Sequence, residues 1–289
     1  MKKKIITMIA VSITAVSGMG YAVATHSNSC STMSSGYEKG TEQVKNASST
    51  DRSNTGDYSS LDGAGSGWGF VRKKGKAPEI PAAQSDMLEK YNGRYLDHEN
   101  KKNLYLTFDE GYENGFTAVI LDTLAKTETP AAFFVTGPYL EGQSELIQRM
   151  IDEGHIVGNH TVHHLNLPKQ PVETVQSEIT SLNDKCEELY GYKMTYMRPP
   201  EGEFSERTLA VANDLGMRTI MWSFAYKDWD VNVQQGADYA YESVIPYLHD
   251  GAVILLHAVS SDNANALERI ITEAKNEGYS FRPLDDLYK

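Results

Sequence analysis

From Asn103 to the C-terminus, short apolar runs rich in β-branched and aromatic residues alternate with segments of helical periodicity. No other feature constrains the fold as strongly, because a regular strand–helix succession is typical of parallel strands covered by helices. The strand-like runs are NLYLTFD, AAFFVTG, HIVGNH, KMTYMRPP, MRTIMWSFA, AVILLHA and a weaker YSFRPL. They predict an α/β fold with about seven strands, arranged as a barrel or as an open doubly wound sheet.

The segments between these runs carry the helical pattern, and several end in glycine, the usual residue at a helix C-terminus. They are FTAVILDTLAKT, SELIQRMIDEG, VETVQSEITSLNDKCEELYG, SERTLAVANDLG, ADYAYESVIPYLH and NALERIITEAKNEG. We expect each of them to form a helix that packs against the sheet.

The N-terminus has the parts of a secretory signal peptide. Three lysines precede a mainly apolar run that ends in the small-x-small sequence Ala22-Val23-Ala24. We therefore expect residues 1–24 to be a signal peptide that is cleaved after Ala24. The alternative is an uncleaved membrane anchor, since the run from Ile5 to Ala24 is long enough to span a bilayer. Either way the rest of the chain is expected to be exported, extracytoplasmic and located at the cell envelope.

Changes in composition divide the remainder of the chain. Residues 25–67 are mostly Ser, Thr, Gly, Asn and charged residues, a composition that cannot bury enough surface to fold and predicts a flexible linker. The next segment begins with WGFVRKKGKAPEIP, and we expect 68–102 to be a lead-in that packs on the edge of the domain. Residues 103–289 form the predicted catalytic domain.

The charge distribution excludes one class of partner. The formal net charge is −12, with +5 in residues 1–76 and −17 in residues 77–289. A domain this acidic is poorly suited to bind phosphate backbones, so no nucleic-acid partner is expected. Cys30 and Cys186 lie in segments of different character and predict no disulfide. No protein partner is predicted.

Five polar residues fall at or just beyond the C-terminal ends of strand-like runs. In a parallel barrel those ends converge on one face, which is where active sites lie. Accidental packing is a poor explanation for five polar residues at five strand ends, and the pattern therefore predicts an enzyme. The residues are Asp109, His160, Arg198, Asp228 and His257.

The stretch HTVHH contains a candidate metal pair. His160 and His164 are four residues apart, so on a helical turn both rings point the same way. Neutral imidazole is a common ligand of Zn²⁺ and similar cations. Surface or capping histidines explain the pattern equally well. His163 points elsewhere if the other two share a face, and we expect it to lie outside the site.

Two further motifs offer polar groups to the same face. Asp109 and Glu110 could supply a general base and a third metal ligand, although a solvent-exposed strand cap is the alternative. The two prolines that follow Arg198 in RPPEGEF stiffen the turn, which can aim the backbone N–H of Glu201 at an oxyanion.

The last motif concerns a possible acid and its aromatic surroundings. Asp228 can stabilise the imidazolium form of His257 and raise its pKa, although a lone histidine at a strand end is more often a hydrogen-bonded rim residue. Trp222, Tyr226 and Trp229 fit two interpretations equally well, as core residues or as platforms on which sugar rings stack.

Together these residues resemble the polysaccharide deacetylases of the NodB-homology class, a carbohydrate esterase family. The resemblance covers roughly residues 101–287 and includes five family motifs in order: TFDE, HTVHH, RPPEG, WSFAYKDW and LLHAVS. TFDEGYENG, WSFAYKDW and LLHAVSSDNANAL are also similar to the delta-lactam-biosynthetic de-N-acetylases of spore cortex peptidoglycan. Glu110 departs from the usual second Asp of the first motif, and the delta-lactam branch likewise lacks Asp there.

The resemblance implies a distorted (β/α) barrel of about seven parallel strands. It also implies a divalent metal cofactor, zinc in the first instance with other divalent cations as alternatives, held by His160 and His164. Glu110 is the candidate third ligand, and its departure from the family pattern leaves metal dependence open.

The resemblance further implies a role for each polar residue at the site. Asp109 takes a proton from water while Arg198 orients it, the N–H of Glu201 stabilises the oxyanion, and His257 paired with Asp228 protonates the leaving amine. Three side chains are expected to contact substrate: Trp222 and Leu255, which line a slot for the acetyl methyl group, and Trp229.

These roles predict a metal-assisted de-N-acetylase that acts on peptidoglycan glycan strands. The first expectation for its substrate is N-acetylmuramic acid, on the way to muramic delta-lactam in spore cortex. One alternative is N-acetylglucosamine in peptidoglycan or chitooligosaccharides. Another, prompted by Glu110, is an envelope carbohydrate-binding protein with weak catalysis.

Overall fold

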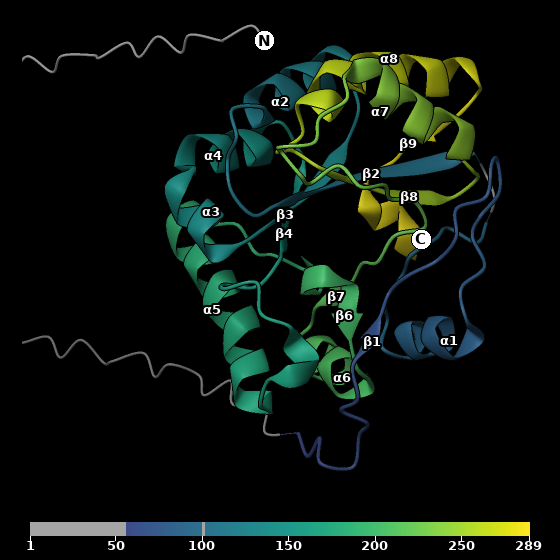
Figure 1. Cartoon of the computed structure of the whole chain (residues 1–289). Helices are drawn as coiled ribbons and strands as arrows, with labels where there is room; N and C mark the ends of the chain where they lie inside the picture. Colours follow the sequence, from purple (N-terminus) through teal and green to yellow (C-terminus); the bar gives the residue numbers. More distant parts are fainter. Residues whose placement is uncertain (1–55, 100–101) are drawn as a thin grey trace, which may run out of the picture. The chain divides into compact units, whose positions relative to one another are not determined.

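A sheet of parallel strands forms the centre of the protein in the computed structural model, which describes residues 56–99 and 102–289. The strand order is β7-β5-β4-β3-β2-β8, and β9 also pairs with β2 (Figure 1). The bounds are β2 Asn103–Glu110, β3 Ala131–Val135, β4 Ile156–Asn159, β5 Tyr196–Met197, β7 Arg218–Thr219, β8 Ala252–His257 and β9 Ser280–Phe281. The prediction of about seven parallel strands is confirmed.

The sheet closes on itself only in part. Between β7 and β8 the chain continues without a regular strand, and single bridges join Arg94 to Ile220 and Phe224 to Ile254. A further antiparallel bridge joins Leu96 to Ala252. Because isolated bridges replace full strands along this arc, the fold is a distorted (β/α) barrel, as expected.

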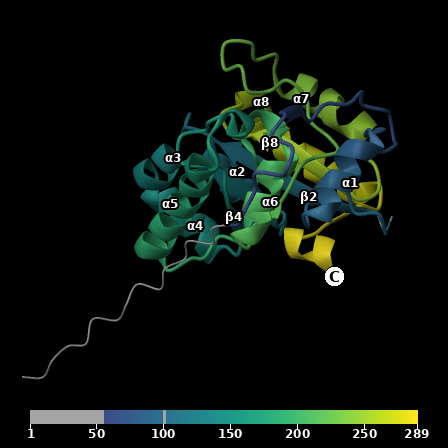
Figure 2. The same cartoon turned by 90° about the horizontal axis from the view of Figure 1, so that it is seen from below.

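Each of the predicted helical segments forms a helix outside the sheet, and two helices were not predicted. The predicted ones are α2 Thr117–Lys126, α4 Ser144–Asp152, α5 Val172–Tyr190, α6 Glu206–Asp214, α7 Ala237–Val244 and α8 Ser261–Asn276. The additional ones are α1 Ala82–Lys90 and the short α3 Gly137–Gly142. Along the barrel wall α8 packs against both α7 and α2, and α5 packs against α6 (Figure 2).

The side chains of β2 alternate between two apolar layers, as the pleat of a strand requires. Leu106 and Phe108 face the helices, where Phe108 stacks on Phe133 with 5.2 Å between ring centroids. Tyr105 faces the interior of the barrel, in a cluster that includes Phe134 and Val253. The same alternation sends residue 109 to the inner face and residue 110 to the helix side.

Part of the predicted flexible linker packs on the domain instead. Residues 56–67 belong to the predicted linker, yet Tyr58 is buried and its hydroxyl donates to Asp214 at 2.9 Å. Strand β1, Ser66–Gly67, pairs antiparallel with β6, Glu203–Phe204. One aromatic anchor and two backbone pairs therefore order a segment whose average composition is that of a linker. The predicted signal peptide at 1–24 and the linker from 25 to 55 lie outside the described residues.

The lead-in segment packs against residues of the barrel. Trp68, Leu88, Tyr95 and Phe204 belong to one apolar cluster, in which the Trp68 and Tyr95 rings meet edge to face at 5.1 Å. Helix α1 contributes Leu88 to it, and this burial is why the helix forms there. In residues 56–99 and 102–289 there is no helix long and apolar enough to cross a membrane.

Candidate active site

A pocket of about 840 Å³ opens at the C-terminal ends of the strands. It combines a polar floor with aromatic walls, and it brings together residues from the β2, β4, β5 and β8 ends and from the lead-in. Its lining is Trp68, Gly69, Phe70, Arg72, Asp109, Gly111, Tyr112, His160, His164, Glu201, Gly202, Trp222, Ala225, Tyr226, Trp229, Leu255, His257 and Val259.

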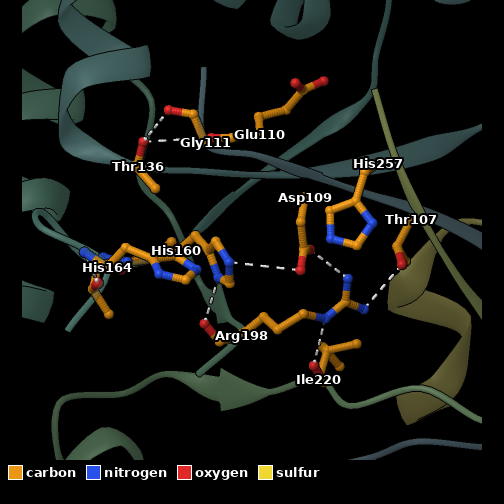
Figure 3. A network of polar contacts seen from close by, with 12 residues as sticks. Thr107, Asp109, Glu110, Gly111, Thr136, His160, His164, Arg198, Ile220 and His257 are labelled. Atoms are coloured by element: carbon orange, nitrogen blue, oxygen red, sulfur yellow. Dashed lines mark hydrogen bonds and ion pairs between the residues drawn. The ribbon is translucent and has the colours of Figure 1, made fainter. Parts of the chain in front are cut away.

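Asp109 lies in the polar floor, where Arg198 holds it (Figure 3). Asp109 Oδ1 accepts a hydrogen bond from Arg198 Nη1 at 2.7 Å. The other guanidinium nitrogens donate to Thr107 Oγ1 at 2.9 Å and to the Ile220 carbonyl at 3.0 Å. Arg198 is fully buried and lies over the Phe134 ring, so its direction is fixed on every side.

The charge of Arg198 decides the ionisation of Asp109. Burial alone would raise the pKa of Asp109, but the positive charge of Arg198, with smaller contributions from His160 and His257, lowers it below its usual value. Asp109 is therefore a carboxylate at neutral pH, and its Oδ2 is the oxygen that the Arg198 bond leaves free.

His160 follows strand β4 and faces this free oxygen. Its Nδ1 lies 2.8 Å from the Arg198 carbonyl, which can only accept, so Nδ1 carries the proton. The unprotonated Nε2 lies 3.6 Å from Asp109 Oδ2. Burial lowers the pKa of His160 to about 4, so the ring is neutral and Nε2 keeps its lone pair.

The rings of His160 and His164 come together, but not on a helical turn as predicted. Residues 160–164 form a loop in which Thr161 and His164 have φ angles of 67° and 54°. The His164 N–H donates to Thr161 Oγ1 at 3.0 Å and stabilises this unusual backbone. The two ring centroids are 4.8 Å apart and the planes cross at 73°.

His163 lies outside the pocket, as expected. Its Nδ1 is 2.6 Å from Glu178 Oε1, and its backbone N–H donates to Glu178 Oε2 at 2.8 Å. Its ring is exposed on the side of α5. The histidine therefore anchors the loop to α5 and offers nothing to the pocket.

The expectation that Glu110 could be a metal ligand is wrong. Successive side chains of a strand point to opposite faces, so with Asp109 in the pocket Glu110 turns towards the helices (Figure 3). It is fully buried there and neither carboxylate oxygen has a hydrogen-bond partner. Burial, with the nearby charges of Glu113 and Asp109, raises its pKa well above the usual value.

With Glu110 outside the pocket, the metal-binding side chains grouped at this end of the floor are His160, His164 and Asp109. Nowhere in residues 56–99 and 102–289 do three His, Cys, Asp or Glu side chains cluster closely enough to hold a cation by themselves. The donor types nevertheless suit a borderline cation, because His160 presents a lone pair beside Asp109 and close to the second ring.

On the opposite side of the floor, His257 forms a dyad with Asp228. His257 Nδ1 lies 2.7 Å from Asp228 Oδ1, and the His257 backbone N–H donates to Oδ2 at 2.8 Å. Burial alone would lower the pKa of His257, but the charge and hydrogen bond of Asp228 raise it above its usual value. Because β2 and β8 pair in register, His257 lies directly beside Asp109.

Asn263 fixes the dyad and was not predicted. Its Nδ2 donates to Asp228 Oδ2 at 2.6 Å and to the His257 carbonyl at 3.2 Å, and Tyr226 donates to its Oδ1. Asn263 lies in the first turn of α8, where its N–H donates to Ser260 Oγ at 3.2 Å. The sequence signal was the SSDNAN cluster directly after LLHAV, which is typical of a helix N-terminus.

The RPPEG turn brings Glu201 to the pocket. Glu201 and Gly202 both have left-handed backbone angles, with φ of 60° and 68°. A Cβ on Gly202 would lie 2.7 Å from the Trp222 ring, so only glycine fits against this wall. The turn is thereby packed directly on the aromatic side chain that forms the neighbouring wall.

The predicted substrate-contacting side chains all line the pocket, together with three aromatic residues and one arginine that were not predicted. Leu255 is buried, Trp222 is half-buried, and Trp229 is exposed with its ring 5.7 Å from that of His257. The residues missed belong to the lead-in, whose segment 68–72 we call the strap, and to the loop after β2. They are Trp68, Phe70, Arg72 and Tyr112. The signal for the strap was WGFVR, where large side chains first follow the polar segment.

Comparison with known proteins gives one family and several relatives. Residues 97–220 match the model of the polysaccharide deacetylase family. The chain is 45% identical over 222 residues to the peptidoglycan-N-acetylmuramic acid deacetylase PdaA of Bacillus subtilis, covering 76% of this chain and 84% of PdaA. It is 32% identical to the peptidoglycan-N-acetylglucosamine deacetylase PgdA of Listeria monocytogenes, covering 74% of this chain and 41% of PgdA.

Solved structures agree with the sequence comparison. A solved structure of Bacillus subtilis PdaA, a family 4 carbohydrate esterase, matches with a TM-score of 0.77 and 43% identity over 79% of this chain and 98% of the chain in that structure. A wild-type family 4 pseudoenzyme from Bacillus anthracis matches with a TM-score of 0.63 and 28% identity, over 68% of each chain.

Proposed function

Because this chain belongs to the polysaccharide deacetylase family and is a deacetylase, we propose that it removes N-acetyl groups from peptidoglycan, with N-acetylmuramic residues as its substrate. The observation that carries the proposal is the in-register pair of Asp109 and His257 across the floor of one pocket. A carboxylate kept ionised and an imidazole biased towards its protonated form supply a base and an acid to the same substrate. Similarity to PdaA supports the choice of sugar.

In the proposed hydrolysis, a water molecule attacks the acetyl carbonyl carbon while Asp109 takes one of its protons. The oxyanion that forms is stabilised by the backbone N–H of Glu201, which the RPPEG turn carries to the pocket. His257 then protonates the amide nitrogen as the carbon–nitrogen bond breaks. Acetate leaves, and the sugar keeps a free amine that, in a muramic residue, lies near its own lactyl carboxyl.

His160 and His164 are the side chains that would hold a divalent cation, zinc being the first choice. The cation would act as a Lewis acid towards the acetyl carbonyl. The Arg198 carbonyl already fixes the His160 tautomer that leaves Nε2 unprotonated, which is the form a metal ligand needs. Glu110 has no part in this site.

Variants of the base and the acid test the mechanism. We expect Asp109→Asn and His257→Ala to lower acetate release from peptide-stripped peptidoglycan by about 100-fold to 10,000-fold, the range of general acid–base catalysis. His163→Ala removes a side chain outside the pocket but keeps the backbone N–H that binds Glu178 and holds the loop, so it is the control and should match the parent. Acetate release at the parental rate in Asp109→Asn would show that the assigned mechanism is wrong.

N-acetylglucosamine, in peptidoglycan or chitooligosaccharides, is the second candidate substrate. Similarity to PgdA favours it, and the largely aromatic walls fit it as well as the muramic sugar, since aromatic rings stack on either one. Mass spectrometry of the treated glycan separates the candidates, because loss of acetate only at glucosamine would exclude the muramic assignment.

A carbohydrate-binding role with weak catalysis is the candidate from another class. Similarity to a pseudoenzyme favours it, as does the absence of Glu110 from the pocket. The observation for it would be no acetate release from any glycan, with or without added metal, together with retained glycan binding.

We further propose that the protein is exported and acts on the envelope, on the sequence of its first 24 residues. A mature chain that begins at Thr25 would support this proposal. A chain found in the cytoplasm with Met1 intact would contradict it. The place of the reaction in spore cortex delta-lactam formation is proposed on the resemblance alone.

A further inference from the structure

The strap forms one side of the pocket and is firmly attached to the barrel. The Trp68 backbone N–H donates to the Gly202 carbonyl at 2.9 Å, and its indole N–H donates to the Trp222 carbonyl at 2.8 Å. The strap is thus joined to the RPPEG turn and to the aromatic wall, and Arg72 at its end lines the same pocket.

Arg72 is held in one direction by contacts that leave most of its donors unused. Its Nη1 donates to the Ser243 carbonyl at 3.1 Å. The guanidinium carbon lies 4.5 Å from the centroid of the Tyr247 ring and 5.7 Å from that of Phe224. A guanidinium has five N–H donors, so this half-buried group can still bind a planar anion.

The charge of Arg72 has no counterpart in the part of the chain that the structure describes. Four arginines of the described residues pair with carboxylates, among them Arg198 with Asp109 and Arg269 with Asp238. Arg72 takes part in none of these ion pairs, although the chain has 39 Asp and Glu against 27 Lys and Arg. It is also the one Lys or Arg side chain among the described residues that line the pocket.

We propose that Arg72 binds the lactyl carboxylate of a muramic residue and so makes the pocket selective for an anionic amino sugar. The assignment rests on the proposed deacetylase function and names the group that distinguishes its two candidate sugars. The lactyl ether stands on the ring carbon next to the one that bears the acetamide, so both groups of one sugar enter the same pocket. Arginine suits this partner because its planar fork matches a carboxylate.

Equilibrium binding tests the assignment without depending on turnover. The probes are peptide-stripped peptidoglycan strands and the same strands with their lactyl carboxylates reduced to alcohols. Both are titrated into protein carrying Asp109→Asn, so that bound glycan is not hydrolysed. We expect the carboxylate form to bind about 10-fold to 100-fold more tightly, the range for one charge-assisted hydrogen-bonded contact, and this preference to disappear when Arg72→Gln is added.

Two further variants separate recognition from folding. Arg269→Gln is the matched control, since Arg269, like Arg72, stacks on a tyrosine: its guanidinium carbon lies 3.7 Å from the centroid of Tyr241, outside the pocket. It should keep the full preference. Arg72→Lys keeps the charge without the fork and should keep part of the preference, which preserves the test if Arg72→Gln fails to fold.

The outcomes distinguish this assignment from the proposed function. Equal binding of the two glycans, or a preference that survives Arg72→Gln, overturns the role of Arg72. Stem-bearing strands, in which the lactyl group is an amide, should bind more weakly than stripped strands. If stem-bearing strands bound as tightly as stripped strands, the partner of Arg72 would be a stem-peptide carboxylate. That result would overturn the lactyl assignment. If the parent releases no acetate but binds stripped strands through Arg72, the deacetylase function fails and the recognition role stands.

Discussion

His257 and Asp228 show how one hydrogen-bonded pair sets the protonation of the pocket. Nδ1 of His257 is bound to Asp228, which leaves Nε2 as the nitrogen available to a substrate. The Asp228 charge favours the imidazolium form and raises the pKa of His257 against the effect of burial. An acid of this kind must be protonated to act, so activity is present below its pKa and is lost as the pH rises through it.

Replacing Asp228 should therefore move the alkaline limb of the pH profile. In Asp228→Asn the carboxylate charge is gone while the shape remains, so the pKa of His257 falls and the alkaline limb of kcat/KM shifts to lower pH. We expect a fall in kcat of about 10-fold or more at neutral pH as well. The measurement is kcat/KM against pH on stripped glycan. Asp238→Asn, a surface carboxylate paired with Arg269, is the control, and an unmoved limb in Asp228→Asn would contradict the dyad.

Among the elements, the RPPEG turn depends most on a single residue type. Gly202→Ala should destabilise the protein by about 2–4 kcal/mol, because the new Cβ meets the Trp222 ring and the backbone must stay left-handed. Acetate release should fall at least about 10-fold, since the turn carries Glu201. Thermal unfolding and acetate release measure the two effects.

A second glycine separates backbone strain from packing. Gly216 also has a left-handed φ, of 78°, but a Cβ there meets no atom within 4 Å. Gly216→Ala should therefore cost only about 1–2 kcal/mol and leave acetate release unchanged. If both variants lose the same stability and keep full activity, the turn does not position the pocket.

The element pattern of the sequence predicted the sheet and most of the helices because apolar periodicity reflects burial directly. The same periodicity showed where each strand ends, and Asp109 and His257 were predicted as site residues from their positions at those ends. The placement of Glu110 was equally available from the pleat, since a strand that turns residue 109 inwards must turn residue 110 outwards. The family motif places both adjacent carboxylates at one site, and the prediction for Glu110 followed the motif and not the pleat.

Other parts of the site depend on contacts that no local pattern encodes. The loop of His160 and His164 is stabilised by left-handed residues and by the bond from His164 N–H to Thr161, where spacing alone predicted a helical turn. The strap enters the pocket through bonds from Trp68 to Gly202 and Trp222, more than 130 residues further along the chain. The periodicity of a sequence does not predict long-range contacts of this kind.

For the whole molecule, a cation at the histidine pair would couple metal binding to global stability. A ligand that binds only the folded state stabilises it by RT ln(1 + [L]/Kd), about 2.7 kcal/mol at 100 times Kd. We expect added zinc to raise the melting temperature of the parent protein by several degrees. The rise should vanish in His160→Ala and His164→Ala, because each removes one of the two imidazoles that lie 4.8 Å apart.

Two matched control variants test which side chains the zinc-dependent rise in melting temperature requires. His163→Ala removes the neighbouring ring that is bound to Glu178, and Glu110→Gln removes the carboxyl that faces the helices. Both should keep the full zinc-dependent rise, since neither side chain reaches the pocket. An undiminished rise in His160→Ala and His164→Ala would assign zinc to some other part of the chain, and a rise lost only in Glu110→Gln would restore that carboxylate as a ligand.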